Sequence, residues 1–159
     1  MKINKDKKFL AQRCVEVPEQ DIARVSGVLK RELFLLPNAY GLASNQLGLR
    51  YRAFAMRIQK PRELGEYNYI DDLHIKAIGG ILTFINPIIL DSWGTAPKYE
   101  EKCLSLKKTF KVPRRSNLSV TDDLVMKGKR LELYGKNAQI FQHEMDHLNG
   151  ITIETRSKL

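Results

Sequence analysis

The amino-acid sequence predicts an α+β fold in which mixed or antiparallel β-strands pack around a helix near the C-terminal end. One segment has the apolar periodicity of a helix, a second helical segment lies near the C-terminal end, and several short strand-like segments, one of them rich in β-branched residues, lie between the two. The chain contains 159 residues, of which 43% are hydrophobic and 28% are charged. These proportions are typical of one globular domain, so we expect residues 1–159 to form a single domain.

The first helix is predicted over residues 18–36, where apolar side chains recur at steps of three and four. It ends before Pro37-Asn38, a dipeptide that breaks helices. Residues 40–46 are mostly small and contain a glycine, which predicts a loop. Residues 59–80 are polar and irregular and predict an excursion from the domain.

Strands are predicted over residues 49–58, 81–90, 98–105, 117–122 and 130–134. Asn86-Pro87 interrupts the second of these segments, so we expect that strand to bend or to lie at a sheet edge. The last helix is predicted over residues 138–149, with Asn137 as its N-cap and Gly150 as its C-terminal stop.

The composition argues against several classes of protein. No apolar run approaches the ~20 residues of a membrane-spanning helix, and the basic N-terminus lacks the apolar stretch of a secretory signal. Two cysteines, Cys14 and Cys103, do not form a disulfide framework, which favours a reducing, cytoplasm-like compartment. The net charge of +9 is enough to attract a polyanion or an acidic surface, although a solvated basic surface is the simpler interpretation.

Residues 142–147 read QHEMDH and carry the strongest chemical signal. His143 and His147 lie four residues apart, so on a helix they stack on one face and can share one metal ion. Glu144 follows the first histidine and can reach a water molecule on that metal without coordinating the metal itself. In this HExxH arrangement the metal acidifies the water and the carboxylate takes its proton. The last helix is therefore predicted to be a metal-binding helix.

A catalytic metal site needs a third protein ligand and one open position. The candidates are the two cysteines and any carboxylate. Cys103 lies at the end of a predicted strand, and a thiolate with two imidazoles suits zinc or ferrous iron. Cys14 is interpreted as an ordinary buried apolar residue. In residues 39–46 the small side chains would let the backbone approach a ligand, and Gln46 offers an amide donor to an oxyanion.

Together these three segments resemble the signature motifs of the peptide deformylase family. Residues 39–46 are similar to the family pattern GxGLAAxQ, residues 101–105 to EGCLS, and residues 142–150 to QHExDHLxG. The order and spacing also agree, and the likeness extends over residues 18–150. Three residues depart from the patterns, namely Ala39, Ser44 and Lys102. Lys102 replaces a glycine beside the expected metal ligand, which would alter the rim of the substrate groove or its charge.

The C-terminal segment also differs from many bacterial members of that family. The chain ends nine residues after Gly150, without the C-terminal helix that is associated with ribosome docking in those members. The resemblance is therefore to a short form, similar to phage-encoded members, and their docking mode is not carried over. It implies a bacterial or phage-infected bacterial cytoplasm as the location, with an organelle left open.

The resemblance implies hydrolysis of the N-terminal formyl group of nascent polypeptides, which leaves formate and a free methionine amine. It implies that Cys103, His143 and His147 bind the metal and that Glu144 is the general acid and base. Family members use Fe²⁺ in vivo, with Zn²⁺ or Ni²⁺ as substitutes. The expectation of iron rests on the resemblance, because ligand chemistry alone favours zinc.

The remaining implied roles concern the oxyanion and the substrate. Gln46 and the backbone N–H of Leu104 would stabilise the oxyanion that forms from the formyl group. Tyr40 and Ile140 are expected to line an apolar slot for the methionine side chain, and Gly41 to offer backbone hydrogen bonds to the peptide. The expected partners are N-formylmethionyl nascent peptides and the ribosome near its exit tunnel, with no membrane and no sequence-specific DNA.

Five other residues receive structural expectations. Asp146 and Gln142 are expected to support the metal ligands or the helix that carries them. Glu101 is expected to form an ion pair with Arg114. His74 stands alone in a polar segment and is interpreted as an exposed or packed histidine rather than a ligand.

Two other functions stay open on the sequence alone. A general HExxH metallopeptidase would cleave internal peptide bonds, but that class usually completes its site with histidine or a carboxylate rather than cysteine. A basic ribosome- or RNA-binding domain would instead hold a structural metal in a closed site with four ligands. Three ligand candidates next to a base favour an open, catalytic site.

Overall fold

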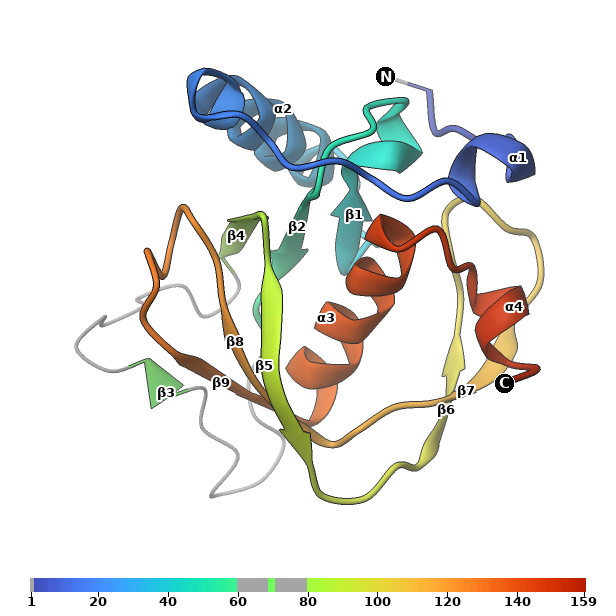
Figure 1. Cartoon of the computed structure of the whole chain (residues 1–159). Coiled ribbons are helices and arrows are strands. Elements are labelled where there is room, and N and C mark those ends of the chain that lie inside the picture. The colour runs from blue at the N-terminus through green and yellow to red at the C-terminus, as the bar shows by residue number, and fades with distance from the viewer. Residues whose placement is uncertain (1, 60–68, 71–79) are drawn as a thin grey trace.

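The computed structural model describes residues 2–59, 69–70 and 80–159 of the chain. Helix α3 (Gly135–Leu148) lies at its centre, and three sheets lie around this helix (Figure 1). Every pairing between labelled strands in these residues is antiparallel. The α+β class predicted from the sequence is therefore confirmed.

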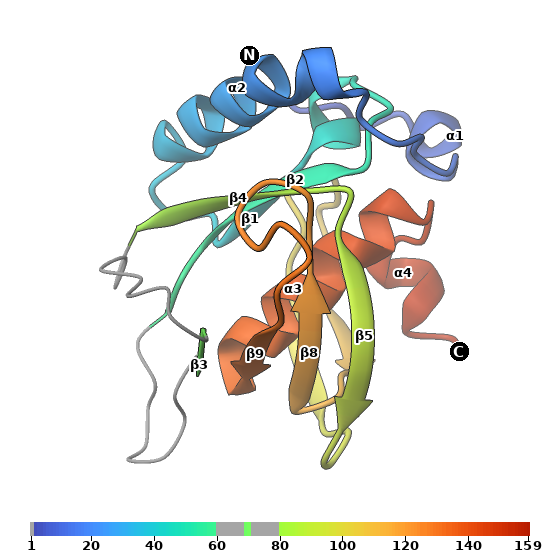
Figure 2. The same ribbon diagram turned by 60° about the vertical axis from the view of Figure 1, so that its left-hand side comes forward.

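The first sheet separates two helices. It has the order β1-β2-β4, and its strands are Gly41–Ala43, Ala53–Arg57 and Ile81–Ile85. Helix α2 (Ile22–Phe34) crosses its outer face and α3 lies beneath its inner face (Figure 2). The central strand β2 is buried on both faces, because Phe54 and Met56 pack toward α3 while Ala53 and Ala55 pack toward α2.

The other two sheets flank α3. The second sheet has the order β3-β9-β8-β5, and its strands are Tyr69–Ile70, Leu131–Tyr134, Asn117–Thr121 and Ile88–Trp93. The third sheet is the hairpin of β6 and β7, which span Lys98–Glu101 and Phe110–Pro113. Figure 1 shows these two sheets on opposite sides of α3.

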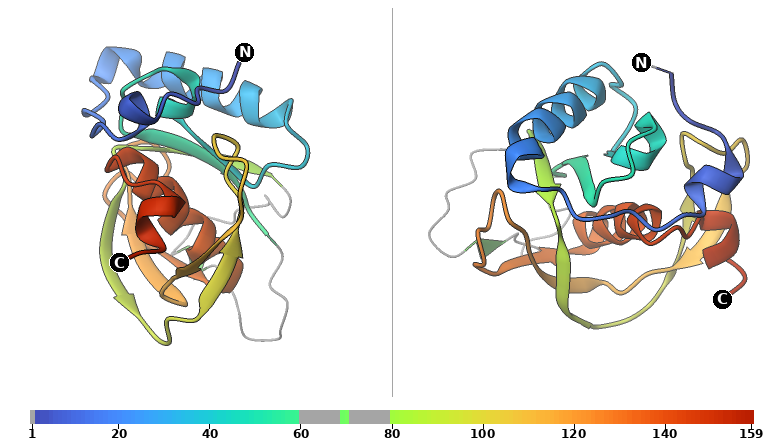
Figure 3. Two further views of the ribbon diagram at one scale, coloured as in Figure 1. Left: turned by 90° about the vertical axis from the view of Figure 1, so that its right-hand side faces the viewer. Right: turned by 45° about the horizontal axis from the view of Figure 1, so that its top comes forward.

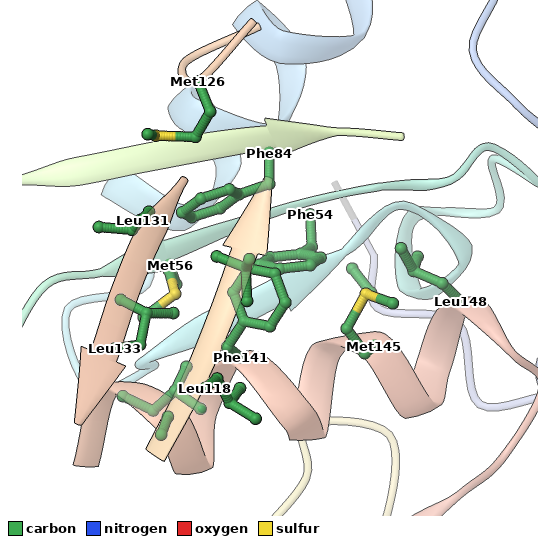
Figure 4. Close-up of a cluster of buried hydrophobic side chains, with 14 of the residues drawn as sticks. Phe54, Met56, Phe84, Leu118, Met126, Leu131, Leu133, Phe141, Met145 and Leu148 are labelled. Carbon is green, nitrogen blue, oxygen red and sulfur yellow. The ribbon is translucent and has the colours of Figure 1, made fainter. Parts of the chain in front are cut away.

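The main core lies between α3, the inner face of the first sheet and the second sheet (Figure 4). Three phenylalanines, Phe54, Phe84 and Phe141, meet there with ring centroids 5.0–5.2 Å apart. Phe141 lies on α3, so its packing fixes the helix against the first sheet. This contact holds the helical residues that follow Phe141 in a defined position.

The segment predicted as a loop over residues 40–46 is instead the strand β1, followed by a 3₁₀-helix at Ser44–Leu47. Its backbone pairs with β2, with Gly41 opposite Met56. Leu42 and Ala43 are fully buried. The loop prediction is wrong because the small side chains permit close packing of β1 against α3, and the partner strand β2 is not visible from this segment alone.

The strand predicted over residues 81–90 divides at Asn86 into β4 and β5, which belong to different sheets. Each of the two is an edge strand, so the expected bend and edge position are both confirmed. Asn86 has a φ of 49°, and its side chain accepts a hydrogen bond from the backbone of Val17 at 2.8 Å and donates to Asp123 at 2.8 Å. The asparagine amide stabilises the turn that redirects the chain.

Helix α3 begins earlier than predicted, and Asn137 is not its N-cap. Tyr134 occupies the N-cap position, and Asn137 lies inside the first turn. The Asn137 side chain instead bonds to the backbone of Gln59, accepting at 2.8 Å and donating at 3.0 Å. Gly150 follows the helix with a φ of 72°, which confirms its predicted role as the stop.

Several short elements were not predicted. They include the helices α1 and α4, which span Lys7–Leu10 and Ile153–Arg156, and the strand β7. The helix predicted over residues 18–36 is a 3₁₀-helix at Glu19–Asp21 followed by α2. α1 and α4 lie side by side (Figure 3), and Lys7 Nζ lies 3.1 Å from Glu154 Oε2. Only this single helical turn, α4, occupies the C-terminal segment where no helix was expected.

The expected excursion at residues 59–80 lies mostly outside the described residues, as does His74. Within the excursion, the described pair Tyr69–Ile70 forms β3 against β9. None of the helices in the described ranges has the length and apolar character needed to cross a membrane.

Candidate active site

The turn after β6 carries the first site residue. The strand predicted over residues 98–105 ends at Glu101, because the chain turns there and the carbonyl of Cys103 accepts a hydrogen bond from the Leu106 N–H at 3.0 Å. Cys103 is buried, and its thiol lies against α3. The turn therefore brings a sulfur from the third sheet to the central helix.

The two histidines of α3 meet this sulfur. Cys103 Sγ lies 3.2 Å from Nε2 of His147, and the two imidazole rings have centroids 5.1 Å apart. One ligand atom from each of Cys103, His143 and His147 lies within 4.8 Å of the others. One sulfur and two nitrogens in a buried cluster are a donor set that fits a divalent cation such as zinc or ferrous iron.

Glu101 orients His143. Its Oε2 lies 2.8 Å from His143 Nδ1, which leaves Nε2 of that ring to face the cluster. Burial alone would lower the pKa of His143, but the contacts with Cys103 and Glu101 and the charge of Glu144 raise it to about 10. A cation at this site would displace the proton that His143 then holds.

His147 has the opposite electrostatic character. Burial first, and then the charge of His143, lower its pKa well below the ordinary value of 6.5. Its Nδ1 is buried and has no hydrogen-bond partner among residues 2–59 and 80–159. A neutral imidazole is the form that binds a metal, so His147 is ready to act as a ligand.

Glu144 follows His143 on α3, and its carboxylate lies against Gly41 of β1. Its side chain is buried, and its Oε2 has no partner in the part of the chain that the structure describes. Burial raises the pKa of Glu144 from 4.5 to about 7. A carboxyl group with a pKa close to neutrality can both take and give a proton at neutral pH.

Gln46 points its amide toward the sulfur. Its Oε1 accepts a hydrogen bond from the Ala43 N–H at 2.9 Å, which fixes the amide orientation. Its Nε2 lies 3.5 Å from Cys103 Sγ and 3.3 Å from Ser105 Oγ. The 3₁₀-helix after β1 thus places a polar donor beside the candidate metal ligands.

A buried ionic network supports the site from behind. Arg114 donates two hydrogen bonds of 2.8 Å to the carboxylate of Glu101 and one of 2.5 Å to Asp146. Arg156 of α4 also donates to Asp146, at 3.0 Å. The expected pair of Glu101 and Arg114 is present, and the network reaches His143 through Glu101.

The sequence analysis did not predict two of these contacts. One is the hydrogen bond from Arg156 to Asp146, and the other is the contact between Glu101 and His143. The position of Glu101, two residues before Cys103, was the available clue. Gln142 bonds to the backbone of Arg115, at 3.0 Å and 2.8 Å, and so supports the helix α3, which is one of the two roles expected for it.

An open pocket of about 530 Å³ leads to this centre. Cys103, His143 and Glu144 are among its lining residues, together with the predicted substrate residues Tyr40, Gly41, Gln46, Leu104 and Ile140. Tyr40 is 51% exposed at the rim, whereas Ile140 is buried and also packs in the main core. Cys14 does not line the pocket and is a buried core residue, as expected.

Gly41 lies directly against the candidate base. A Cβ atom at this position would lie 2.2 Å from Glu144 Oε1, so Gly41→Ala must displace the carboxylate. We expect turnover to fall by about a hundredfold, because a shift of about 1 Å at a catalytic group has effects of this size. Steady-state kinetics with metal analysis would measure this effect.

Gly27→Ala is the matched control, since a Cβ there meets no atom within 4 Å. It should leave turnover unchanged. Normal turnover in Gly41→Ala would show that the position of Glu144 tolerates displacement and that its carboxylate is not tightly placed for catalysis.

The fold and the site define the class of this protein as a hydrolase with a candidate metal centre, because a buried base stands beside a thiol and two imidazoles. The model of the family described as polypeptide deformylase matches residues 2–158. The chain belongs to the polypeptide deformylase family.

Individual relatives agree with this membership. The peptide deformylase of Clostridium beijerinckii is 30% identical over 152 residues, which cover 95% of this chain and 97% of the relative. That of Pelagibacter ubique is 34% identical over 122 residues, so this chain matches 75% of its own length and 63% of the relative, which is under two thirds. The crystal structure of peptide deformylase from Thermotoga maritima has a TM-score of 0.71 at 26% identity, and the match covers 98% of this chain and 95% of that one.

Proposed function

We propose that Cys103, His143 and His147 hold one divalent cation, and that the chain uses it to remove the N-terminal formyl group from formylmethionyl peptides. Metal-dependent deformylation of nascent peptides is the activity of the family to which the chain belongs. The observation that carries these roles is the convergence of three ligand atoms within 4.8 Å beside the buried carboxylate of Glu144.

The reaction is an amide hydrolysis. When bound, the cation supplies Lewis acidity, which lowers the pKa of water to about 7 and polarises the formyl oxygen. Glu144 takes a proton from the attacking water as the oxygen–carbon bond forms. It then gives that proton to the methionine nitrogen as the carbon–nitrogen bond breaks, so the products are formate and a free amine.

The negative charge that develops on the formyl oxygen needs hydrogen-bond donors. We assign this role to the Gln46 amide and to the backbone N–H of Leu104, since both residues line the pocket next to Cys103. The bond from Ala43 holds the Gln46 amide in place before the substrate arrives. This preorganisation is what makes such donors effective in a site shielded from water.

Gln46→Ala is expected to lower turnover about a hundredfold or more while metal content stays full. Gln46→Glu is the second variant, because it keeps an acceptor for the Ala43 N–H but replaces the amide donor with a carboxylate, whose charge would repel the oxyanion. Kinetics and metal analysis of both variants would test the role. Loss of metal in Gln46→Ala would show that Gln46 supports the metal ligands instead.

The substrate end of the pocket receives the methionine. We assign Tyr40 and Ile140 to the slot for its side chain, and the backbone of Gly41 to hydrogen bonds with the peptide. Ile140 supplies an apolar surface one helical turn before His143, and Tyr40 supplies a ring at the rim. An apolar slot with a few polar groups is the usual arrangement of a small-ligand site.

We propose Fe²⁺ as the ion in vivo, with Zn²⁺ or Ni²⁺ as substitutes. The donor set of one sulfur and two nitrogens suits both zinc and ferrous iron. The preference for iron therefore rests on family membership. The HExxH segment on α3 makes that helix the metal-binding element of the fold.

The decisive experiment is anaerobic purification with metal analysis, followed by an assay of formate release. We expect release from a formyl-Met peptide and none after a chelator has removed the metal. The unformylated peptide is the control for the metallopeptidase alternative, since a peptidase would cleave both peptides internally. A stoichiometric metal without formate release would support a structural metal and contradict the proposal.

We further propose that residues 1–159 act as one catalytic domain, and that the net charge of +9 draws it toward the ribosome in the cytoplasm, near emerging chains. Salt screens attraction between exposed charges. Activity on ribosome-bound formylated chains should therefore fall more steeply with salt than activity on a free formyl peptide. Equal salt sensitivity of the two activities would contradict the ribosome contact.

A further inference from the structure

We propose that this chain prefers peptides with acidic residues directly after the formylated methionine, and that Lys102 and Lys107 recognise those residues. This inference rests on the proposed function and deepens it by naming a substrate class. The two lysines lie on the connection between β6 and β7, which forms one wall of the pocket.

The peptide must pass this wall. The candidate metal centre lies at the floor of the pocket, and the formyl group has to reach it. A nascent chain is much longer than a pocket of about 530 Å³, so the residues after methionine leave through the opening. The residues that line this pocket include Lys102 and Lys107 of the β6–β7 connection and Tyr40, which precedes β1.

Both lysines are exposed and available for a new partner. In the described parts of the chain, no carboxylate lies within ion-pair distance of Lys102 or Lys107. Their neighbour Lys108 differs, because it does not line the pocket and its charge contributes to the lowered pKa of Glu154 on α4. Lys102 and Lys107 therefore lie on the side of this connection that lines the pocket, whereas Lys108 lies on the side that faces α4.

The other charges of the pocket do not cancel the lysines. The buried carboxylate of Glu101 already bonds to Arg114 and His143. Glu100 is the exposed carboxylate of the lining, and it stands opposite Lys111 across the β6–β7 hairpin. Carboxylates of a peptide at the opening would thus meet two cationic side chains.

Lys136 is a third cation of the pocket lining. It holds its ammonium 5.1 Å from the Tyr40 ring centroid and donates to Gln139 at 3.1 Å. The preference does not depend on Lys136, because Lys102 and Lys107 suffice for two acidic residues.

We expect the two lysines to change the affinity for the peptide moderately and to leave the chemical step nearly unchanged. An exposed ion pair changes affinity by about two- to fivefold, so two pairs give about tenfold. The pairs form away from the reacting atoms and are equally present in the ground state and the transition state. They should therefore change KM and leave kcat nearly constant.

The experiment compares formyl-Met-Glu-Glu, formyl-Met-Ala-Ala and formyl-Met-Lys-Lys peptides with C-terminal amides on the metal-loaded enzyme. We expect kcat/KM to be highest for the glutamate peptide and lowest for the lysine peptide. The ratio between these two should shrink as salt is raised, since screening weakens exposed pairs. Equal kcat/KM values for all three peptides would overturn the inference while leaving deformylation established.

Substitutions then locate the preference. The double variant Lys102→Glu with Lys107→Glu should reverse the order of the glutamate and lysine peptides. Lys108→Glu is the control for position, because it reverses one lysine charge, as each substitution of the double variant does, but on the side that faces α4. It should retain the wild-type order. A reversal by Lys108→Glu alone would assign the preference to overall charge and would contradict recognition at this wall.

Absence of formate from every peptide would instead reject the proposed function.

Discussion

Replacing Glu144 by glutamine is expected to lower turnover by about 10²–10⁴-fold, the range that a general acid or base contributes. The substitution keeps the size of the side chain but removes the proton acceptor. The carboxyl group is buried, and its raised pKa of about 7 matches the pH at which it must exchange protons. Its Oε2 has no hydrogen-bond partner in the described residues, so the substitution breaks no hydrogen bond of that atom there, although it removes a charge that helps to raise the pKa of His143.

The metal content of this variant should stay at the wild-type level, because the ligand atoms belong to Cys103, His143 and His147. Formate release and metal analysis on the same preparation measure both quantities. Glu16→Gln serves as the control, since that residue is exposed and does not line the pocket. Wild-type turnover in Glu144→Gln would remove Glu144 from the mechanism, whereas loss of metal would make it a supporting group.

The two long helices were predictable because their signal is local. Apolar side chains at helical spacing mark α2, and the same pattern with Gly150 as the stop marks α3. The HExxH segment could be placed on a helix for the same reason. A sequence pattern of this kind depends on residues within one or two turns, so tertiary contacts do not hide it.

The assignment of strands to sheets was not predictable, because it depends on distant partners. β1 pairs with β2. β2 also pairs with β4, which follows it in the sequence only after residues 60–79. Nothing within residues 40–46 reveals that pairing, so the segment was predicted as a loop. The thiol of Cys103 was identified as a candidate ligand through its motif, but its 3.2 Å approach to His147 depends on the turn after β6.

Asn137 shows why local rules for helix ends can fail. Asparagine is a common N-cap, and the apolar pattern begins just after it. In the folded chain its amide satisfies both the N–H and the carbonyl of Gln59. That long-range contact favours a helical position for Asn137, and the helix starts two residues earlier at Gly135.

Arg114→Met should destabilise the fold by about 3–5 kcal/mol, since removing one partner of a buried ion pair leaves the other charges uncompensated. Arg114 is 2% exposed and neutralises both Glu101 and Asp146. Arg156 still reaches Asp146 in the variant, so the main loss falls on Glu101. Urea unfolding would measure the change in the free energy of unfolding.

The pH dependence gives this prediction a second, independent measure. Burial alone would raise the pKa of Glu101, but hydrogen bonds with Arg114 and His143 lower it from 4.5 to about 2. A pKa lowered by folding contributes stability that is present above about 4.5 and is lost as pH falls toward about 2. Without Arg114 this contribution shrinks, so the difference between the variant and the wild type should be largest near neutral pH and should narrow below pH 4.5.

Two further variants separate the ion pair from other effects of the substitution. Arg115→Met is the matched control, because the neighbouring arginine is exposed and, within the described residues, its side chain donates a hydrogen bond only to the Gly94 carbonyl, at 3.1 Å. It should leave stability nearly unchanged at every pH. Arg114→Lys keeps the charge but loses the two-point contact with Glu101, so its stability should fall between those of Arg114→Met and the wild type. If Arg114→Met were as stable as Arg115→Met at neutral pH, the buried network would not be what fixes Glu101, and the orientation of His143 would need another cause.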